Sequence, residues 1–530
     1  MSVDTNNAEF QDALNLIQYT RQSVFLTGKA GTGKSTFLRY VCEHTKKKHV
    51  VLAPTGIAAI NAGGSTMHSF FKLPFYPLLP DDPNLSLQRG RIHEFFKYTK
   101  PHRKLLEQIE LVIIDEISMV RADIIDAIDR ILRVYSHNLR EPFGGKQLLL
   151  VGDVFQLEPV VKNDERDILN RFYPTPYFFS ARVFGQIDLV SIELQKVYRQ
   201  TDPVFVSVLD HIRTNTAGAA DLQLLNTRYG SQIEESEADM YITLATRRDT
   251  VDSINEKKLA ELPGDSITFE GVIEGDFPES SLPTSQELVL KPGAQIIFIK
   301  NDFDRRWVNG TIGVIAGIDE EEETIYVITD DGKECDVKLE SWRNIRYHYN
   351  EKTKEIEEEV LGSFTQYPIR LAWAITVHKS QGLTFSRVVI DFTGGVFAGG
   401  QAYVALSRCT SLDGIQLKKP VNRADVFVRP EIVNFAGRFN NRQAIDKALK
   451  QAQADVQYAA ASRAFDKGDM EECLEQFFRA IHSRYDIEKP VPRRLIRRKL
   501  GIINTLKEQN KKLKEQMREQ QERIRQYAHE

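Results

Sequence analysis

The chain has 530 residues, of which 42% are hydrophobic and 27% are charged, so it is long enough to form several globular domains. Its 70 Lys and Arg residues nearly balance 74 Asp and Glu residues, which excludes a protein that binds a polyanion over its whole surface. No apolar run reaches about 18 residues, and residues 1–10 lack the layout of a signal peptide. We therefore expect a soluble, cytoplasmic protein without a membrane segment.

Charge is unevenly distributed along the chain. Residues 319–323 and 355–359 are acidic runs, whereas residues 489–530 hold 13 Lys and Arg residues against 5 Asp and Glu residues. We interpret the acidic runs as solvated faces. The cysteines lie far apart and form no C-x-x-C pair, which argues against a disulfide framework and a zinc site. They are Cys42, Cys335, Cys409 and Cys473.

The first strong pattern is a strand, a glycine-rich loop and a helix in direct succession. Residues 23–27 are β-prone, residues 28–35 read G-x-x-x-x-G-K-S, and a helix-like segment begins at Thr36. In this motif backbone N–H groups surround phosphates, Lys34 reaches the β and γ oxygens, and Ser35 offers a hydroxyl to Mg²⁺. The predicted nucleotide-binding residues are Gly28, Ala30, Gly31, Thr32, Gly33, Lys34, Ser35 and Thr36.

Two further segments precede the next strong motif. The apolar residues 50–52 lead into Pro54, Thr55 and Gly56, and at a strand end the threonine and the following N–H groups can bind a phosphate. Residues 72–108 begin with a proline-rich stretch among polar residues. This composition breaks regular structure and predicts a protruding element.

A second strand supplies the carboxylates that a nucleotide site needs. Residues 111–114 are apolar and β-prone, and Asp115 and Glu116 follow directly. Because the carboxyl ends of buried parallel strands face the ligand crevice, we predict that Asp115 holds Mg²⁺ and that Glu116 deprotonates the attacking water. The alternative, a pair that caps the next helix, places both acids at the same strand end.

A third apolar strand, residues 147–151, leads into the sequence GDVFQLEP at residues 152–159. Its amide, Gln156, sits just past a buried strand, where it could sense the γ-phosphate and report its loss. Together the three motifs predict a RecA-like P-loop NTPase lobe over residues 1–180.

The complete set of motifs resembles that of one helicase family. Residues 115–118, 152–159, 194–200, 374–384 and 403–408 are similar, in this order, to conserved motifs of superfamily-one helicases, the last two to motifs V and VI. Residues 202–213 resemble the signature segment of the Pif family, DNA helicases of subgroup B. Dda-like and RecD-like helicases share much of this set, and the signature segment favours Pif. The family's signature closes with a glycine, where this chain has Thr214 and Asn215.

The resemblance implies roles on the ATP side. Two arginines from the second lobe, Arg199 and Arg408, would stabilise the charge that develops during phosphoryl transfer; the alternative is a pair of surface salt bridges. Gln11 lies where the family has its adenine-reading glutamine, with Gln18 as the alternative. Gln381 and Gly382 complete the implied nucleotide-binding set.

Further residues are implied on the DNA side. Residues 65–71 resemble a DNA-contacting segment, with Thr66, His68 and Phe70 as contacts. An aromatic ring there could stack on bases, although Phe70 could equally be a core residue. From the second lobe the implied contacts are Thr376, His378 and Lys379. The insertion at residues 72–108 would include the wedge that splits the duplex.

The second lobe is expected over residues 181–430 and carries an insertion. Short β-prone runs alternate with turns between residues 293 and 368, which suggests a small barrel, and the family has an SH3-like domain here. The runs are residues 295–300, 310–315, 324–329 and 336–339.

The helicase motifs stop near residue 430. Residues 431–488 include a helix, a turn at Gly468 and a second helix, like one tetratricopeptide hairpin, which we expect to pack onto the core. Residues 489–530 are basic and show heptad spacing, with Asn510 as a register-setting polar position. A helix lying on another domain and a dimer coil remain alternatives. The heptad residues are Ile503, Leu506, Asn510, Leu513, Met517, Gln520, Ile524 and Tyr527.

The predicted fold is α/β, with two RecA-like lobes, a wedge element, an SH3-like β-barrel and a helical C-terminal extension. The predicted function is an ATP- and Mg²⁺-dependent helicase that moves along single-stranded DNA. The resemblance implies 5′-to-3′ movement, binding of single-strand/duplex junctions, unwinding of forks, R-loops or G-quadruplexes, and a core active as a monomer. An RNA-directed superfamily-one helicase and a P-loop switch protein are the alternatives, and a protein partner or self-association through the last helix remains open.

Overall fold

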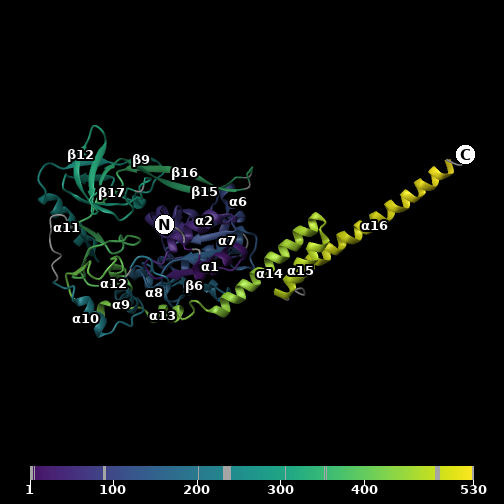
Figure 1. The fold of residues 1–530 in the computed structure, drawn as a ribbon, viewed down its shortest axis with the longest axis horizontal. Helices are drawn as coiled ribbons and strands as arrows, with labels where there is room; N and C mark the ends of the chain where they lie inside the picture. Colours follow the sequence, from purple (N-terminus) through teal and green to yellow (C-terminus); the bar gives the residue numbers. More distant parts are fainter. Residues whose placement is uncertain are drawn as a thin grey trace. The chain divides into compact units, whose positions relative to one another are not determined.

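The computed structural model describes residues 4, 6–87, 91–200, 202–230, 240–304, 306–350, 352–353, 355–483 and 490–527. Two compact units divide the chain, residues 1–445 and residues 446–530. Figure 1 shows the first unit as α/β domains with an attached β-rich insertion, and the second as helices alone.

A six-stranded sheet forms the centre of the first lobe. Its strand order is β3-β2-β4-β5-β1-β6, and every pairing is parallel. The strands are apolar and buried along almost their whole length, as expected for a parallel sheet that is covered on both faces. They are β1 (Val24–Gly28), β2 (His49–Ala53), β3 (Ser65–Thr66), β4 (Leu111–Ile114), β5 (Gln147–Val151) and β6 (Val190–Leu194).

The sheet of the first lobe includes β6, which lies beyond the predicted lobe boundary at residue 180. Val24 in β1 pairs with Val190 in β6, and the pairing continues to Gly28 and Leu194. The chain therefore leaves this sheet at Leu194, immediately beside the glycine-rich loop.

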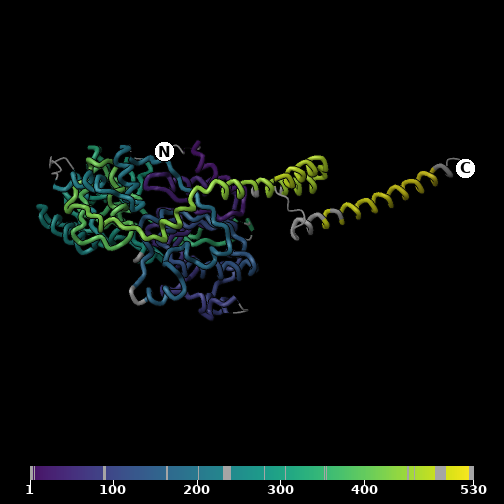
Figure 2. Tube along the Cα trace, turned by 90° about the horizontal axis from the view of Figure 1, so that it is seen from below, coloured from purple at the N-terminus to yellow at the C-terminus, as the bar shows by residue number. Residues whose placement is uncertain are grey.

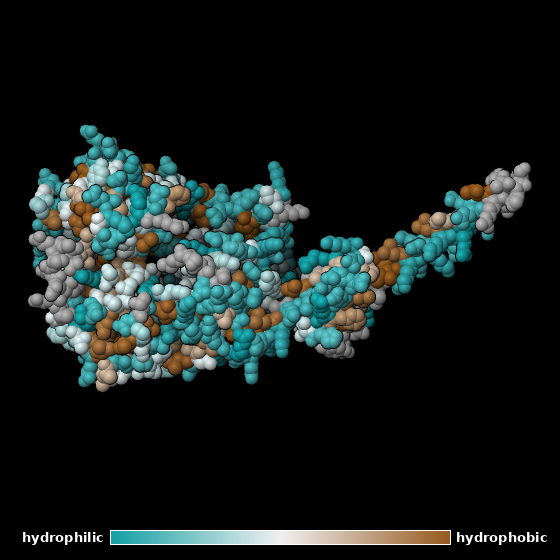
Figure 3. All heavy atoms as spheres, viewed as in Figure 1, coloured by the Kyte–Doolittle hydropathy of each residue, from teal (hydrophilic) through white to brown (hydrophobic). Residues whose placement is uncertain are grey.

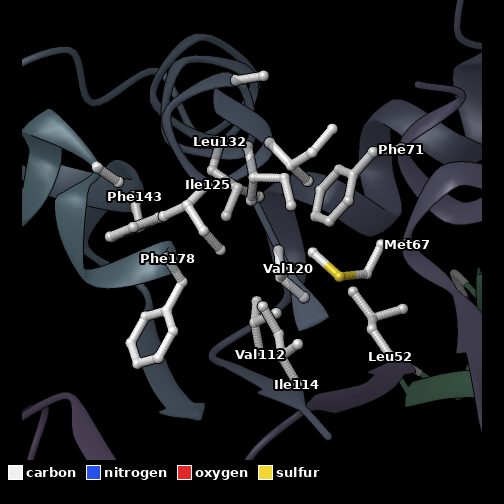
Figure 4. Close-up of a cluster of buried hydrophobic side chains, with 14 of the residues drawn as sticks. Leu52, Met67, Phe71, Val112, Ile114, Val120, Ile125, Leu132, Phe143 and Phe178 are labelled. Atoms are coloured by element: carbon white, nitrogen blue, oxygen red, sulfur yellow. The ribbon is translucent and has the colours of Figure 1, made fainter. Parts of the chain in front are cut away.

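Helices surround this sheet, and several of them share one core with it. Figure 4 shows Val112 and Ile114 of β4 facing Ile125 and Leu132 of α7. The helices are α1 (Ala8–Tyr19), α2 (Lys34–His44), α3 (Gly56–Ala62), α4 (Met67–Phe71), α5 (Arg91–Phe95), α6 (Lys100–Gln108), α7 (Ala122–Tyr135) and α8 (Asn163–Leu169).

The insertion at residues 72–108 is more regular than its prolines predict. Its second half forms α5 and α6, and Leu105 and Leu106 of α6 are fully buried. In its first half Leu78 is buried, whereas Phe75 is 84% exposed. The insertion therefore consists of an irregular, partly exposed loop that is followed by two helices.

The second lobe contains a four-stranded parallel sheet of order β18-β7-β19-β20. Its buried strands form a second core with α9 and α12. The elements are β7 (Ile242–Ala245), β18 (Ala374–Thr376), β19 (Val388–Asp391), β20 (Ile415–Leu417), α9 (Pro203–Arg213), α10 (Ala219–Asn226), α11 (Arg248–Glu261) and α12 (Gln401–Leu406).

The β-rich insertion contains an antiparallel sheet of order β14-β13-β12-β11-β17. Strands β11, β12, β13 and β14 overlap the four predicted β-prone runs, and the stacked rings of Phe298 and Trp307 lie in its core, with centroids 4.4 Å apart. The strands are β8 (Ile267–Glu270), β10 (Glu287–Leu290), β11 (Gln295–Phe298), β12 (Ile312–Asp319), β13 (Thr324–Thr329), β14 (Glu334–Val337) and β17 (Ile369–Leu371).

A long hairpin, absent from the sequence prediction, extends from this insertion to the first lobe. It consists of β15 (Glu340–Asn350) and β16 (Glu355–Gln366), and β9 (Val272–Gly275) pairs with β16. Figure 1 shows it running across to α6. Tyr347 and Tyr349 are buried in the first lobe's core, and the ring of Tyr347 lies 6.2 Å from that of Phe70.

The first unit continues past residue 430 because α13 (Pro430–Ala436) packs on the first lobe. The ring of Phe435 stacks on that of Phe179, with centroids 4.3 Å apart, and also contacts Phe25 and Phe178. This aromatic cluster binds the end of the second lobe to the first sheet.

The C-terminal unit is helical. Helix α14 (Arg442–Lys467) and α15 (Met470–Ser483) lie side by side, as Figures 1 and 2 show, and Gly468 turns the chain between them with φ +84°. The last helix is α16 (Pro490–Tyr527). Among the described helices, none combines the length and the apolar composition that crossing a bilayer requires.

Candidate active site and nucleic-acid surface

The glycine-rich loop closes around the side chain of Lys34. Gly28, Gly31 and Gly33 all have positive φ angles, which L residues rarely adopt. The Lys34 Nζ donates hydrogen bonds to the carbonyl oxygens of Gly28 (2.7 Å) and Lys29 (3.0 Å), and burial lowers the pKa of Lys34. The loop therefore has the compact form in which its N–H groups can surround a phosphate.

Gly31 is required by the close approach of Arg199. A Cβ atom on Gly31 would lie 2.3 Å from the Arg199 Cβ. Burial lowers the pKa of Arg199, whose Nη1 donates to the Ser407 carbonyl at 3.3 Å. The sequence prediction assigned Arg199 to the second lobe, whereas it lies on the segment that leaves β6 of the first sheet.

Asp115 and Glu116 lie at the carboxyl end of β4, as predicted. The Asp115 Oδ1 accepts a hydrogen bond from the Glu116 N–H (2.9 Å), and Glu116 has a left-handed backbone with φ +49°. Burial, and then the charge of Asp115, raises the pKa of Glu116 to about 7. A carboxylate with a pKa near neutrality has the proton affinity that suits a general base.

Arg408 reaches the same centre from the second lobe. Its side chain is only 2% exposed, and its Nε donates to the Val404 carbonyl at 3.1 Å. Burial, and then the nearby charge of Arg199, lowers the pKa of Arg408 to about 9. The charges of Glu116 and Asp153 also act on Arg408, so these groups lie near one another.

Gln156 belongs to a buried ionic network that the sequence prediction missed. The Gln156 Nε2 donates to the Asp153 carboxylate at 3.4 Å. Arg213, the last residue of α9, donates to Asp153 through Nε (3.2 Å) and Nη2 (3.1 Å), and forms an ion pair with Glu193 at 2.8 Å. Its guanidinium also stacks over the ring of Phe155. The signature helix is therefore anchored to the loop that carries Gln156.

A tyrosine joins the second lobe directly to the glycine-rich loop. The Tyr403 hydroxyl accepts a hydrogen bond from the Ala30 N–H at 2.9 Å. Close packing also occurs at Gly400, where a Cβ atom would meet the carbonyl oxygens of Phe155 and Gln156 at 2.3 Å. Motif VI and the residues just before it thus contact the glycine-rich loop and the loop that carries Gln156.

The donors near this centre fit Mg²⁺. Ser35 is the second residue of α2 and is exposed, and Asp115 is a carboxylate whose pKa is raised by burial. Mg²⁺ is bound through one or two protein oxygens together with substrate phosphates, which matches one hydroxyl and one carboxylate. When bound, the ion would neutralise phosphate charge.

Asp4, which precedes α1, and Tyr198 define the neighbouring surface. The side chain of Asp4 accepts hydrogen bonds from the Lys196 Nζ (2.7 Å) and the Tyr198 hydroxyl (2.9 Å). Tyr198 is half exposed, and its Cε2 lies 3.9 Å from a Cβ built on Gly33. Gln11 and Gln18 are both partly buried on α1.

Three predicted DNA-contacting threonines hold the turns after parallel strands. Thr55 caps α3 by accepting from the Ala58 N–H (3.3 Å), and Thr66 caps α4 by accepting from the Ser69 N–H (3.2 Å). Thr376 accepts from the Lys379 N–H (3.2 Å). Pro54 and Gly56 flank Thr55, and Gly56 packs against Ser281, so a Cβ there would clash with Ser281.

The predicted stacking residue Phe70 lies in the core. It is 3% exposed and contacts Phe71, His102 and Tyr347, so the ring is unavailable to a base in this structure. The exposed aromatic is instead Phe75, which stacks on His68 with centroids 5.1 Å apart. Its position between Pro74 and Pro77, in a segment without regular structure, was the sequence signal that could have identified it.

Several basic side chains lie close together beside motif V. Burial, and then the charges of Arg370 and Arg248, lowers the pKa of Lys379. Burial also lowers the pKa of Arg370 to about 10 and lowers that of His378. Arg370, in β17, is close to Lys379 only through the fold, which is why sequence reasoning missed it.

Gln381 and Gly382 follow in the turn after β18. The Gln381 Nε2 is buried without a hydrogen-bond partner among the described residues, and Gly382 has φ +79°. Within the described part of the chain, no recorded contact joins either residue to the glycine-rich loop.

The turn after the signature helix is formed by Thr214 and Asn215, where the family's signature closes with a glycine. Asn215 adopts φ +62°, a conformation that asparagine tolerates better than most residues. Arg423 donates to both the Asn215 side chain (2.6 Å) and its carbonyl (3.0 Å). The chain therefore departs from the family pattern, and its own turn is left-handed at Asn215.

Comparison with known proteins agrees with this geometry. Residues 5–214 match the PIF1-like helicase family. The chain is 34% identical over 412 residues to the ATP-dependent DNA helicase Pif1 of Campylobacter jejuni, covering 74% of this chain and 88% of that protein.

Solved structures give the same result. The structure of Pif1 from Bacteroides sp in complex with ADP-AlF4 is 40% identical, covers 82% of this chain and 97% of its own, and has a TM-score of 0.75. Bacteroides Pif1 bound to single-stranded DNA, also 40% identical and covering 84% and 99%, has a TM-score of 0.59. The chain belongs to the Pif1 family of ATP-dependent DNA helicases.

Proposed function

We propose that this helicase moves along single-stranded DNA by opening and closing its two lobes around ATP. The observation that carries the proposal is the convergence of Arg408 from the second lobe on Glu116, Asp153 and Arg199 at the glycine-rich loop. Because a cation from another lobe stabilises the transferring phosphoryl group only when the lobes are closed, closure is coupled to hydrolysis.

The ATP-side roles follow from this arrangement. Lys34 and the N–H groups of the loop bind the phosphates, and Ser35 and Asp115 hold Mg²⁺. Glu116 takes a proton from water, and Gln156 senses the γ-phosphate. Arg199 and Arg408 stabilise the developing charge. The outer nucleotide contacts are assigned to Gln11, Gln381 and Gly382.

The strand contacts come from both lobes. The turns at Thr55, Thr66 and Thr376 supply hydroxyl and N–H groups for phosphates, as backbone contacts without sequence preference do. Lys379, with Arg370 beside it, supplies positive charge. The stacked pair His68 and Phe75 offers an exposed aromatic face to a base.

The substrate is proposed to be single-stranded DNA and its junctions with duplex. Bacteroides Pif1 has been solved bound to single-stranded DNA, and a related Pif1 structure concerns DNA unwinding at forked duplex DNA. Residues 72–108 supply the wedge, with the loop around Phe75 as its exposed part. The family resemblance supports 5′-to-3′ movement by a monomeric core. On partial duplexes with one tail, unwinding is expected only from a 5′ tail, and unwinding only from a 3′ tail would overturn the polarity.

One assay separates this function from its alternatives. The ATPase rate is measured with no polymer, with single-stranded DNA and with single-stranded RNA. We expect strong stimulation by DNA, whereas an RNA-directed helicase would respond to RNA and a P-loop switch to neither. Lys34→Ala should abolish ATP hydrolysis under all three conditions, while DNA binding remains measurable. Lys196→Ala, which removes an exposed lysine nearby, is the matched control and should keep its hydrolysis.

A further inference from the structure

The last helix carries an apolar stripe that its own unit leaves uncovered. Between Gly501 and Ile524 of α16, every described side chain except that of Ile503 is exposed. Leu506, Leu513 and Met517 are 57%, 58% and 58% exposed, and Ile524 is 67% exposed. Figure 3 shows hydrophobic residues recurring along this helix. Such a stripe is a feature of helices that bind another chain.

The stripe has the residue pattern of a two-stranded coiled coil. In heptad order, Ile503, Asn510, Met517 and Ile524 occupy a positions, and Leu506, Leu513 and Gln520 occupy d positions. Isoleucine at a with leucine at d favours two parallel strands. A single asparagine at an a position specifies register at some cost in stability.

The stripe begins where α16 leaves the helical hairpin. Lys499 would be the preceding d residue, but its ammonium lies 4.4 Å above the ring of Phe465 and pairs with Asp466 of α14. The side chain of Lys499 is therefore engaged within its own unit, and the free stripe starts after Gly501.

We propose that α16 pairs with α16 of a second copy as a parallel, in-register coiled coil that tethers two helicase cores. This alignment places Asn510 against Asn510 and Gln520 against Gln520, so each amide meets an amide. The flanking positions then join Gln509 to Lys514 and Gln516 to Gln521, which brings no like charges together.

The reverse alignment is less favourable. In an antiparallel pair the side-chain amides can also hydrogen-bond to each other when Asn510 of one copy faces Gln520 of the other. This pairing, however, places Lys514 of one copy beside Lys514 of the other at the centre of the coiled coil. Like charges at such flanking positions destabilise a pair. Tethering would raise the local concentration of a second core at the same DNA without a new contact between cores.

The first test is the mass of the full-length protein in solution, by sedimentation over a range of concentrations. We expect twice the 60.6 kDa of one chain. Leu506→Gln with Leu513→Gln should return the mass to one chain, while DNA-stimulated ATPase per core remains unchanged. Glu508→Gln with Glu515→Gln, on the opposite face of the helix, is the matched control and should stay dimeric. A wild-type protein that remains a single chain throughout would overturn the proposal.

The second test determines whether the two α16 helices run parallel or antiparallel. In the parallel alignment residue 524 faces its copy, whereas in the antiparallel one it lies about 27 Å away by the rise of a helix, too far for a disulfide. Ile524→Cys should therefore cross-link under mild oxidation, and Glu522→Cys, on the outer face, should not. A dimeric mass without cross-linking at residue 524 would overturn the parallel arrangement.

Discussion

At the scale of single residues, Glu116 combines two features that rarely coincide. Its backbone is left-handed, with φ +49°, and its buried carboxyl lies beside Asp115. Non-glycine residues in this conformation cost of order 1–3 kcal/mol and concentrate at functional sites. The strain is explained if the turn after β4 must direct this carboxyl toward Lys34 and Arg408, whose charges act on it.

The pKa of Glu116 predicts a pH dependence. Because burial and Asp115 raise it from 4.5 to about 7, the base is protonated and inactive at lower pH. DNA-stimulated turnover should therefore rise with pH through a midpoint near 7 rather than near 4.5. Turnover at saturating ATP is measured from pH 5 to 9, with ATP binding measured in parallel. A rate that is already maximal at pH 5.5 would rule out Glu116 as the titrating base.

Arg213 predicts a stability effect. Its side chain and that of Asp153 are 3% and 0% exposed, so removing the arginine leaves a buried carboxylate without its partner. Arg213→Ala should lower the free energy of unfolding of the first unit by about 3–5 kcal/mol. Chemical denaturation measures this change.

Two further variants make that prediction specific. Arg213→Ala with Asp153→Asn should lose less stability than Arg213→Ala alone, since the fully buried Asp153 charge is removed together with its partner. Arg346→Ala removes an exposed ion pair with Glu359 and should cost less than about 1 kcal/mol. Equal effects of Arg213→Ala and Arg346→Ala would contradict the buried network.

At the scale of elements, the β15–β16 hairpin links the insertion to the first lobe. Tyr347 and Tyr349 are buried against that lobe, and the Lys48 ammonium lies 5.2 Å from the ring of Tyr349. Ile345 and Ile356 pack beside the two tyrosines, so the tip of the hairpin shares the apolar core of the first lobe.

Truncating both tyrosines tests this contact. Tyr347→Ala with Tyr349→Ala should speed backbone hydrogen exchange in α6 and in the hairpin, because both lose their apolar cover. Exchange in the glycine-rich loop should not change. Tyr326→Ala, on an exposed face of β13, is the control. Unchanged exchange in α6 would show that the hairpin does not protect it.

At the scale of the whole molecule, every proposed ATP and DNA contact lies in the first compact unit, residues 1–445. A chain ending at Ile445 should therefore keep its DNA-stimulated ATPase. The basic helix α16 should add affinity mainly at low salt, where exposed charges act furthest. ATPase is measured against DNA concentration for both chains at two salt levels. A folded, shortened chain that binds ATP but ignores DNA at both salts would make the tail the primary DNA site.

Local chemistry explains why much of this site could be read from residue order. The loop from Gly28 to Ser35 and the acids after β4 depend on backbone conformation and strand ends, which neighbouring residues determine. The same holds for the helix–turn–helix around Gly468, where a glycine takes a positive φ.

Other residues acquire their roles only through packing across long sequence separations. Arg213 meets Asp153, Arg370 meets Lys379, and Tyr347 meets Phe70 because separate elements fold together. A register shift between Asn344 and Ile345 interrupts the alternation of exposed and buried residues along β15, so the length of the hairpin was not predicted.

By itself, the sequence determined the family, the two-lobed α/β class, and the glycine-rich loop with the acids after β4, because those depend on short motifs with fixed backbone chemistry. Only the tertiary structure decided that β6 pairs in the first sheet, that Arg199 packs against Gly31, that Phe70 is core while Phe75 is exposed, and that Asn215 has a left-handed backbone. The physical reason is that strand pairing and burial depend on which distant surfaces meet, and residue order alone does not specify those contacts.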